Sequence, residues 1–95
     1  MREERLISIE GRVVGGERTF VIAEIGSNHQ QELGVAHELI DAAYASGADA
    51  VKFQSINLNE LYYNPSRSIR ELHKQIDLDE KWHYDLKEYA DSRGI

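Results

Sequence analysis

Three side chains in the first part of the sequence have the types and spacing to do chemistry together: Glu24, Lys52 and Gln54. Each lies near the end of a short apolar run, where charged groups are costly unless they are paired or used. Lys52 is the best anion anchor of the three, which indicates a phosphate or carboxylate ligand. From spacing alone, a catalytic pair and a buried structural ion pair are equally compatible with Glu24 and Lys52.

The elements that must position these residues are two predicted strands joined by a helix. Residues 19–25 are apolar on both alternating faces as far as Glu24, which is typical of a parallel sheet covered by helices. A second strand is predicted at 48–54, and a helix at 33–46, with Gly47 after its end. That helix has a single apolar stripe, formed by Ala36, Leu39, Ile40 and Ala43.

Alternation along the strands places the three candidates on one side of the sheet. Glu24 shares a face with Ile22 in the first strand, and Lys52 shares a face with Gln54 in the second. The wholly apolar faces are expected to pack under helices, so the polar face is expected to look toward a barrel interior. All three candidates lie at the carboxyl ends of their strands, where α/β barrels place their active sites.

The rest of the chain predicts a hairpin before this unit and helices after it. Residues 1–17 are typical of a small β-hairpin with its turn at Glu10-Gly11. Alternating strands and helices favour an α/β fold, and two parallel strands cannot bury both of their faces. An eight-stranded barrel or an open multi-stranded sheet would bury them, and either needs more chain than this.

Two helices are predicted after a polar stretch at 57–67. Capping-box patterns at Ser68–Glu71 and Asp77–Glu80 predict where they begin, and Gly94 predicts where the second one ends. The second helix has an apolar stripe expected in the core, formed by Trp82, Leu86, Tyr89 and Ala90.

Other candidate residues carry weaker signals. Asn28 and His29 lie in the loop after the first strand, where a substrate contact is plausible, although an Asx-type turn explains Asn28 almost as well. The four histidines have no metal-ligand spacing. Gly26 and Gly47 are isolated, so the sequence contains no dinucleotide fingerprint or phosphate loop.

Composition excludes several classes of protein. The net charge is −6, with 17 acidic and 11 basic residues, and no basic face for nucleic acid is visible. No apolar run is long enough to cross a bilayer, and the first residues are not those of a secretory signal. The absence of cysteine suits a reducing cytoplasm.

Two segments together resemble a known family. FVIAEIGSNH at 20–29, followed by LIDAAYASGADAVKFQ at 39–54, is similar to the opening of the N-acetylneuraminate (sialic acid) synthases. That family includes legionaminic and pseudaminic acid synthases and spore-coat polysaccharide relatives. LDEKWHYDLKEYADSRGI at 78–95 resembles the family's helix before its third strand. The resemblance covers nearly the whole chain, but only the first portion of the family's domain.

The resemblance implies a transferase. Members condense phosphoenolpyruvate with an N-acetylated amino sugar such as N-acetylmannosamine, giving a nine-carbon 2-keto acid and phosphate. Of the barrel and the open sheet, it implies that residues 18–95 are the N-terminal part of a TIM (β/α)8 barrel, with its first two βα units and the remainder absent. It further implies a divalent metal (Mn²⁺ or Mg²⁺) and a cytoplasmic homodimer in which an antifreeze-like domain covers the site. The family's metal-binding histidines lie beyond Ile95, so we expect no metal ligand here and no activity from the chain alone.

Carried over by position, the resemblance assigns roles to individual residues. Glu24 matches a catalytic glutamate that orients the sugar or water, and Lys52 matches the lysine that neutralises phosphoenolpyruvate. Gln54, Asn28 and Asn64 are expected to contact substrate. Two positions depart from the family: Gln30-Gln31 stands where Asn-Gly is common, and Arg70 replaces a frequent aromatic residue.

Two other functions remain open from the sequence. The chain could be a non-catalytic module that associates with itself or with a complementary chain through exposed strand faces. It could also belong to another phosphoenolpyruvate-using barrel synthase that makes a different keto acid.

Overall fold

The hairpin at the start of the chain forms as predicted. The computed structural model describes residues 5–95, so the part of the predicted hairpin at residues 1–4 lies outside it. Strands β1 (Ile7–Ile9) and β2 (Arg12–Val14) pair antiparallel. Glu10 and Gly11 form the two-residue turn, with φ of 50° and 79°, and positive φ at both positions is what a type I′ turn requires. The domain boundary after residue 17 stays a prediction.

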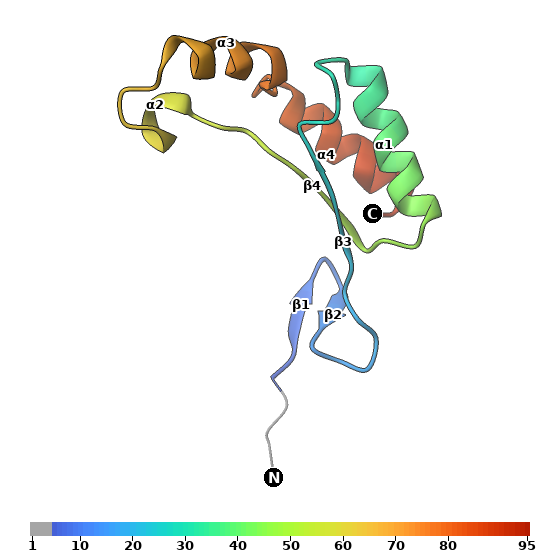
Figure 1. Cartoon of the computed structure of the whole chain (residues 1–95). Helices are drawn as coiled ribbons and strands as arrows, with labels where there is room; N and C mark the ends of the chain where they lie inside the picture. The colour runs from blue at the N-terminus through green and yellow to red at the C-terminus, as the bar shows by residue number, and fades with distance from the viewer. Residues whose placement is uncertain (1–4) are drawn as a thin grey trace.

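A parallel βαβ unit follows the hairpin. It consists of β3 (Ile22–Gly26), α1 (Leu33–Ala45) and β4 (Ala50–Phe53), and the two strands lie side by side (Figure 1). Both strands are shorter than predicted, whereas the helix matches its predicted range to within one residue. Gly47 has φ of 87°, which allows the chain to turn out of α1 toward β4.

Three helices follow β4. They are α2 (Leu58–Leu61), α3 (Arg67–Ile76) and α4 (Trp82–Arg93). The short helix α2 lies within the stretch expected to be merely polar, because one helical turn is too short to show a periodic pattern. Gly94, with φ of 84°, ends α4 as predicted.

Both predicted capping boxes are wrong. Helix α3 is capped two residues earlier, by Ser66, whose Oγ accepts the Ile69 N–H at 3.3 Å, so Ser68 lies inside the helix. Asp77 is the C-cap of α3 instead of a start for α4. A turn then intervenes, in which the Asp79 carboxylate accepts the Lys81 N–H at 3.0 Å. Neighbouring polar residues compete for such bonds, and only the chain's path decides between them.

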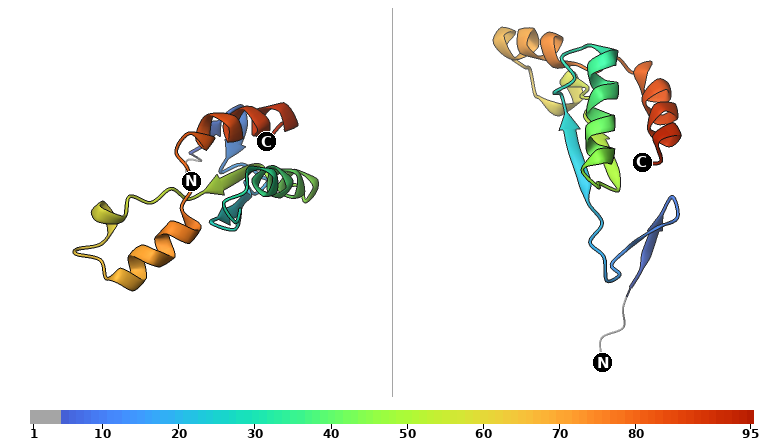
Figure 2. Two further views of the ribbon diagram at one scale, coloured as in Figure 1. Left: turned by 90° about the horizontal axis from the view of Figure 1, so that it is seen from above. Right: turned by 90° about the vertical axis from the view of Figure 1, so that its right-hand side faces the viewer.

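The core lies between the strands and two helices on one side of them. Figures 1 and 2 show α1 and α4 together on that side. Val51 and Phe53 pack against the core and Ile25 is buried in it, whereas Val21, on the same predicted face, is 47% exposed. The predicted burial of the apolar strand face is therefore confirmed except at Val21. Ile22 on the opposite face is 55% exposed. The buried apolar residues of the cluster are Ile25, Ala36, Ile40, Leu78, Leu86 and Ala90, with Trp82 and Tyr89 partly buried beside them.

Helices α2 and α3 extend away beyond the carboxyl ends of the strands (Figure 1). Neither contains a buried residue. The radius of gyration is 16.4 Å, against about 12 Å for a compact domain of this length. The chain is therefore elongated, and one sheet face is left uncovered by residues 5–95. No helix within those residues has the length and apolar character needed to span a membrane.

Candidate active site

Glu24 and Lys52 lie opposite each other in neighbouring strands. They are partners in the parallel register of β3 and β4, and Lys52 Nζ is 3.4 Å from Glu24 Oε2. The Lys52 side chain is 61% exposed and that of Glu24 is 47% exposed. Exposed ion pairs contribute only about 0–1 kcal/mol to stability. The Glu24–Lys52 pair lies half-exposed on the open face of the sheet. Its contribution to stability is therefore too small to explain why an acid and a base stand at these two positions.

Gly26 brings Gln54 to the same place. After the Glu24–Lys52 pair the register shifts, so that Gly26 pairs with Phe53 and its carbonyl accepts the Gln54 N–H at 3.3 Å. Gly26 is buried and has φ of 59°. A Cβ at this position would lie 3.2 Å from Glu24 Oε1 and 3.8 Å from the Gln54 amide oxygen. The Glu24 carboxylate and the Gln54 amide thus both lie next to the position that a Cβ of Gly26 would take. Together with the Glu24–Lys52 pair, this places Glu24, Lys52 and Gln54 in one group.

Asn28 lies at the edge of this group. It is exposed in the loop after β3, and its backbone N–H donates to the Ile25 carbonyl at 3.0 Å, as a tight turn requires. Asn28 and Glu24 both line a groove of about 330 Å³ between β3 and α1. Asn28 therefore borders the same groove as Glu24, at the edge of the group.

His29 is fully buried, which places it in the packing of the loop. Its Nδ1 accepts the Gln31 N–H at 2.9 Å, and its ring meets Trp82 edge-on at 6.0 Å between centroids. Burial lowers the pKa of His29 below its ordinary value of 6.5, although the charge of Asp77 opposes this shift. Because Nδ1 accepts a hydrogen bond, the ring proton is on Nε2, which has no partner among residues 5–95. The plausible substrate contact from His29 thus stays a prediction, while its packing role is evident.

Asn64 is not brought to the other predicted site residues. It is exposed between α2 and α3 with φ of 47°. No hydrogen bond or ion pair within residues 5–95 joins it to Glu24, Lys52 or Gln54. Its expected substrate contact stays a prediction.

The side chains in the described range do not fit a metal ion. No group of three or more histidine, aspartate or glutamate side chains gathers there that could hold one. The Glu24 carboxylate faces an ammonium group, and His29 Nδ1 already accepts a backbone N–H. The negative charge of Glu24 is thus paired with Lys52, and the lone pair of His29 Nδ1 is used in a hydrogen bond.

Asp49 is a positioning residue that the sequence did not reveal. Its carboxylate accepts the Val21 N–H at 2.8 Å and the Arg18 guanidinium at 2.6 Å, while its own N–H donates to the Val21 carbonyl. The Val21 hydrogen bond, and then the Arg18 contacts, hold the pKa of Asp49 below its usual value. This carboxylate ties the start of β4 to the residue before β3, and so sets the register that pairs Glu24 with Lys52.

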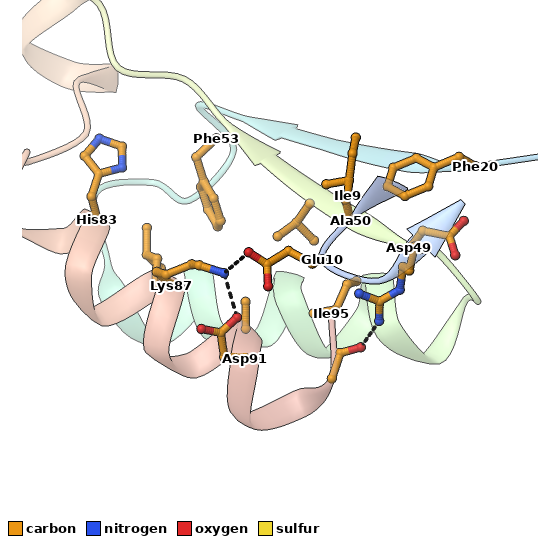
Figure 3. A pocket seen from close by; sticks show the side chains of 15 residues that line it. Ile9, Glu10, Phe20, Asp49, Ala50, Phe53, His83, Lys87, Asp91 and Ile95 are labelled. Carbon is orange, nitrogen blue, oxygen red and sulfur yellow. Dashed lines mark hydrogen bonds and ion pairs between the residues drawn. The ribbon is translucent and has the colours of Figure 1, made fainter. Parts of the chain in front are cut away.

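A separate cavity lies between the hairpin, β4 and α4 (Figure 3). Its volume is about 490 Å³, and Phe20 and Phe53 contribute to its apolar wall. At its rim the Lys87 ammonium is 2.8 Å from Asp91 and 3.8 Å from Glu10, and Arg12 of the hairpin donates to the Gly94 carbonyl. None of the predicted site residues lines this cavity, so the polar group at Gly26 is a distinct feature of the opposite face.

Known proteins share this sequence and fold. The model of the NeuB family matches residues 39–95. An uncharacterised protein of Methanocaldococcus jannaschii is 43% identical over 90 residues, covering 94% of this chain and 26% of that protein. N,N'-diacetyllegionaminic acid synthase of Legionella pneumophila is 42% identical over 89 residues, covering 80% and 25%. Human N-acetylneuraminate-9-phosphate synthase is 34% identical over 99 residues, covering 90% and 27%.

A solved structure extends the comparison to the fold. The N-acetylneuraminic acid (sialic acid) synthetase of Leptospira borgpetersenii superposes with a TM-score of 0.84 at 31% identity, over 97% of this chain and 32% of that one. The chain spans about a quarter of the length of its curated relatives. The expected fold, the beginning of a TIM barrel preceded by a hairpin, is confirmed. On the sequence match and the shared fold together, the chain belongs to the NeuB family.

Proposed function

We propose that this chain forms the N-terminal part of a transferase that condenses phosphoenolpyruvate with an N-acetylated amino sugar resembling N-acetylmannosamine. The products would be a nine-carbon 2-keto sugar acid and phosphate. The observation that carries the proposal is the half-exposed Glu24–Lys52 pair beside Gln54, at the carboxyl ends of parallel strands. Relatives named as synthases of legionaminic acid and N-acetylneuraminate 9-phosphate support the choice of reaction.

The proposed reaction forms one carbon–carbon bond, and at C2 it exchanges the bond to the phosphate oxygen for a bond to a water oxygen. The methylene carbon of phosphoenolpyruvate attacks the aldehyde carbon of the open-chain sugar, and positive charge develops at C2. Water adds to C2 and gives one proton to the aldehyde oxygen; the bond from C2 to the phosphate oxygen then breaks, and the second water proton leaves with the phosphate. Inorganic phosphate leaves, and the keto group remains at C2.

Two residues of this chain would act on the reacting groups. The Lys52 ammonium would bind the phosphate or carboxylate of phosphoenolpyruvate, since it is a cation with more than half of its side chain exposed on the open face. Glu24 would orient the sugar or the attacking water, which requires a carboxylate held at a fixed place. Gln54, Asn28 and Asn64 would contact the substrates.

Other parts of the proposed enzyme lie outside these residues. A divalent metal, Mn²⁺ or Mg²⁺, would act as a Lewis acid on the sugar aldehyde. Because the described residues do not fit a metal ion, its ligands would come from other segments of the whole enzyme. We further propose a cytoplasmic homodimer, and we expect no synthase activity from the 95-residue chain alone.

The test uses a hybrid protein in which this chain replaces the matching third of the Leptospira synthetase. Phosphate release with phosphoenolpyruvate, manganese and a panel of N-acetylated amino sugars would be measured, and mass spectrometry of the product would separate this reaction from other keto-acid syntheses. Lys52→Met should lower kcat/KM by roughly 10- to 150-fold, the equivalent of losing a hydrogen bond to a charged group, about 1.5–3 kcal/mol. Glu24→Gln should lower kcat by roughly 100-fold.

Lys74→Met is the matched control for the lysine variant. The Lys74 side chain is 73% exposed on α3, and within residues 5–95 its one ion pair is with Glu71, at 3.9 Å. Replacing this side chain should therefore leave kcat/KM unchanged. If Lys52→Met behaved like Lys74→Met in an active hybrid, the proposed role of Lys52 would be wrong.

A non-catalytic, self-associating module is a second candidate function. Val21, just before β3, is 47% exposed, and Ile22, the first residue of β3, is 55% exposed. Exposed apolar side chains at a strand favour this function, because they promote association. Sedimentation of the chain distinguishes the two, because a well-folded species that stays strictly monomeric would exclude self-association.

A further inference from the structure

Helix α3 and the segment that carries Asn64 are held to the rest of the chain by few contacts. No residue of α2 or α3 is buried. The base of this excursion is closed by His73, whose Nε2 lies 2.9 Å from the Ile56 carbonyl. Leu78, just after the C-cap of α3, is buried in the core and anchors the end of this segment. Within α2 and α3 themselves, polar contacts supply the remaining hold.

Gln31 makes the contact that reaches across to the end of α3. Its side-chain amide donates to the Lys74 carbonyl at 2.8 Å and to the Asp77 carbonyl at 3.1 Å. Carbonyls in the last turn of a helix have no partner within the helix. One amide group from the loop after β3 thus satisfies two carbonyls at the end of α3.

The backbone of Gln31 is fixed by a hydrogen bond to a buried side chain. Gln31 has φ of 56°, a left-handed conformation that costs a residue with a Cβ free energy. Its N–H donates to Nδ1 of the fully buried His29. A buried ring therefore stabilises an unfavourable backbone conformation, and this conformation carries the Gln31 amide toward α3.

We propose that Gln31 is a positioning residue that clasps α3 to the loop after β3, and thereby sets where residues 57–66, with Asn64, stand relative to the Glu24–Lys52 pair. The positioning of a sugar contact rests on the proposed function, whereas the clasp itself does not. On this view Gln31 touches no substrate. It acts through the segment it holds, and so governs the affinity for the sugar rather than the chemical step.

Gln30 provides a matched control one residue away. It has φ of 55°, is exposed, and makes no side-chain hydrogen bond within the described residues. Gln31→Gly and Gln30→Gly relieve the same backbone conformation, but only the first removes the clasp. Gln31→Glu keeps the size of the side chain and removes its donor, and Gln30→Glu controls for the added charge.

The first measurement is amide hydrogen exchange in the full 95-residue chain. Both Gln31 variants should speed exchange of the last-turn amides of α3, including that of Asp77, by roughly fivefold, as expected for one lost hydrogen bond. The Gln30 variants should leave those rates unchanged. Equal rates in the wild type and the Gln31 variants, or no protection of α3 in the wild type, would overturn the clasp.

The second measurement uses the hybrid synthase. The Gln31 variants should raise KM for the amino sugar by roughly fivefold, following the same lost bond, with kcat and KM for phosphoenolpyruvate little changed. Faster exchange with an unchanged sugar KM would reduce Gln31 to a structural role and overturn the positioning. An inactive wild-type hybrid would instead count against the proposed function, and the exchange rates would then decide the clasp by themselves.

Discussion

Replacing Gly26 by alanine should disturb the candidate site in a way that can be separated from backbone strain. The new Cβ would stand 3.2 Å from Glu24 Oε1, closer than nearly all such contacts, so the carboxylate must shift by a few tenths of an ångström. Gly26 also has φ of 59°, and left-handed backbone costs a residue with a Cβ about 1–2 kcal/mol. Gly26→Ala should therefore lower both the stability of the chain and the activity of the hybrid synthase.

Two other glycines of the same βαβ unit serve as controls that separate the backbone strain from the contact with Glu24. Gly47 has φ of 87° but nothing within 4 Å of its ideal Cβ, so Gly47→Ala should show the strain of about 1–2 kcal/mol alone. Gly34 is exposed in α1 with a free Cβ position and no positive φ, so Gly34→Ala should stabilise the chain by about 0.5 kcal/mol. Urea unfolding followed by fluorescence of Trp82, the sole tryptophan, measures the three free energies.

Of the alanine variants at these glycines, only Gly26→Ala should lower kcat of the hybrid synthase. Misplacement by about 1 Å can cost about 100-fold in rate, so a shift of a few tenths of an ångström at Glu24 should lower kcat by roughly tenfold. Gly47→Ala should leave kcat of the hybrid unchanged despite its similar strain. If both alanine variants lost activity equally, the loss would follow from stability, and the argument that Gly26 makes room for the Glu24 carboxylate would be refuted.

The remaining predictions concern the stability of the chain. His29 has a pKa lowered by burial, so the folded state binds fewer protons than the unfolded state; the stabilisation is complete above the ordinary pKa of 6.5 and is lost progressively as the pH falls below it. Urea midpoints from pH 8 to 5 should fall in the wild type and change less in His29→Asn, and parallel profiles would contradict this. Ile40 is fully buried between α1 and the strands, so Ile40→Ala should cost about 2–5 kcal/mol; exposed Leu72→Ala, measured in the same way, should cost under about 1 kcal/mol.

The order of the elements could be predicted because it depends on local patterns. Short apolar runs marked β3 and β4, and the stripe from Ala36 to Ala43 marked α1. Positive φ at Gly11, Gly47 and Gly94 matches the positions where the sequence indicated turns or helix ends. These features are decided by residues close in sequence, so a single sequence contains the information.

The contacts between distant residues could not be predicted in the same way. The serine that caps α3 depends on the path of the chain, and the short α2 has too few residues to show a pattern. Gln31 meets Lys74 across 43 positions, and Asp49 meets Val21 across 28. Hydrogen bonds of this kind leave no periodic signal, because each requires only one polar side chain at each end.

The sequence by itself predicted the α/β class, from the alternation of strands and helices. It also predicted the shared face of Glu24 and Lys52, because the apolar face of each strand was expected to pack under helices. Only the tertiary structure decided that the two are paired at 3.4 Å on an open face, that Gly26 gathers Gln54 beside them, and that His29 is buried. The register between strands is the physical reason. It depends on Asp49, the bulge after Glu24 and the packing of α1 and α4, all of which exist only once the chain has folded.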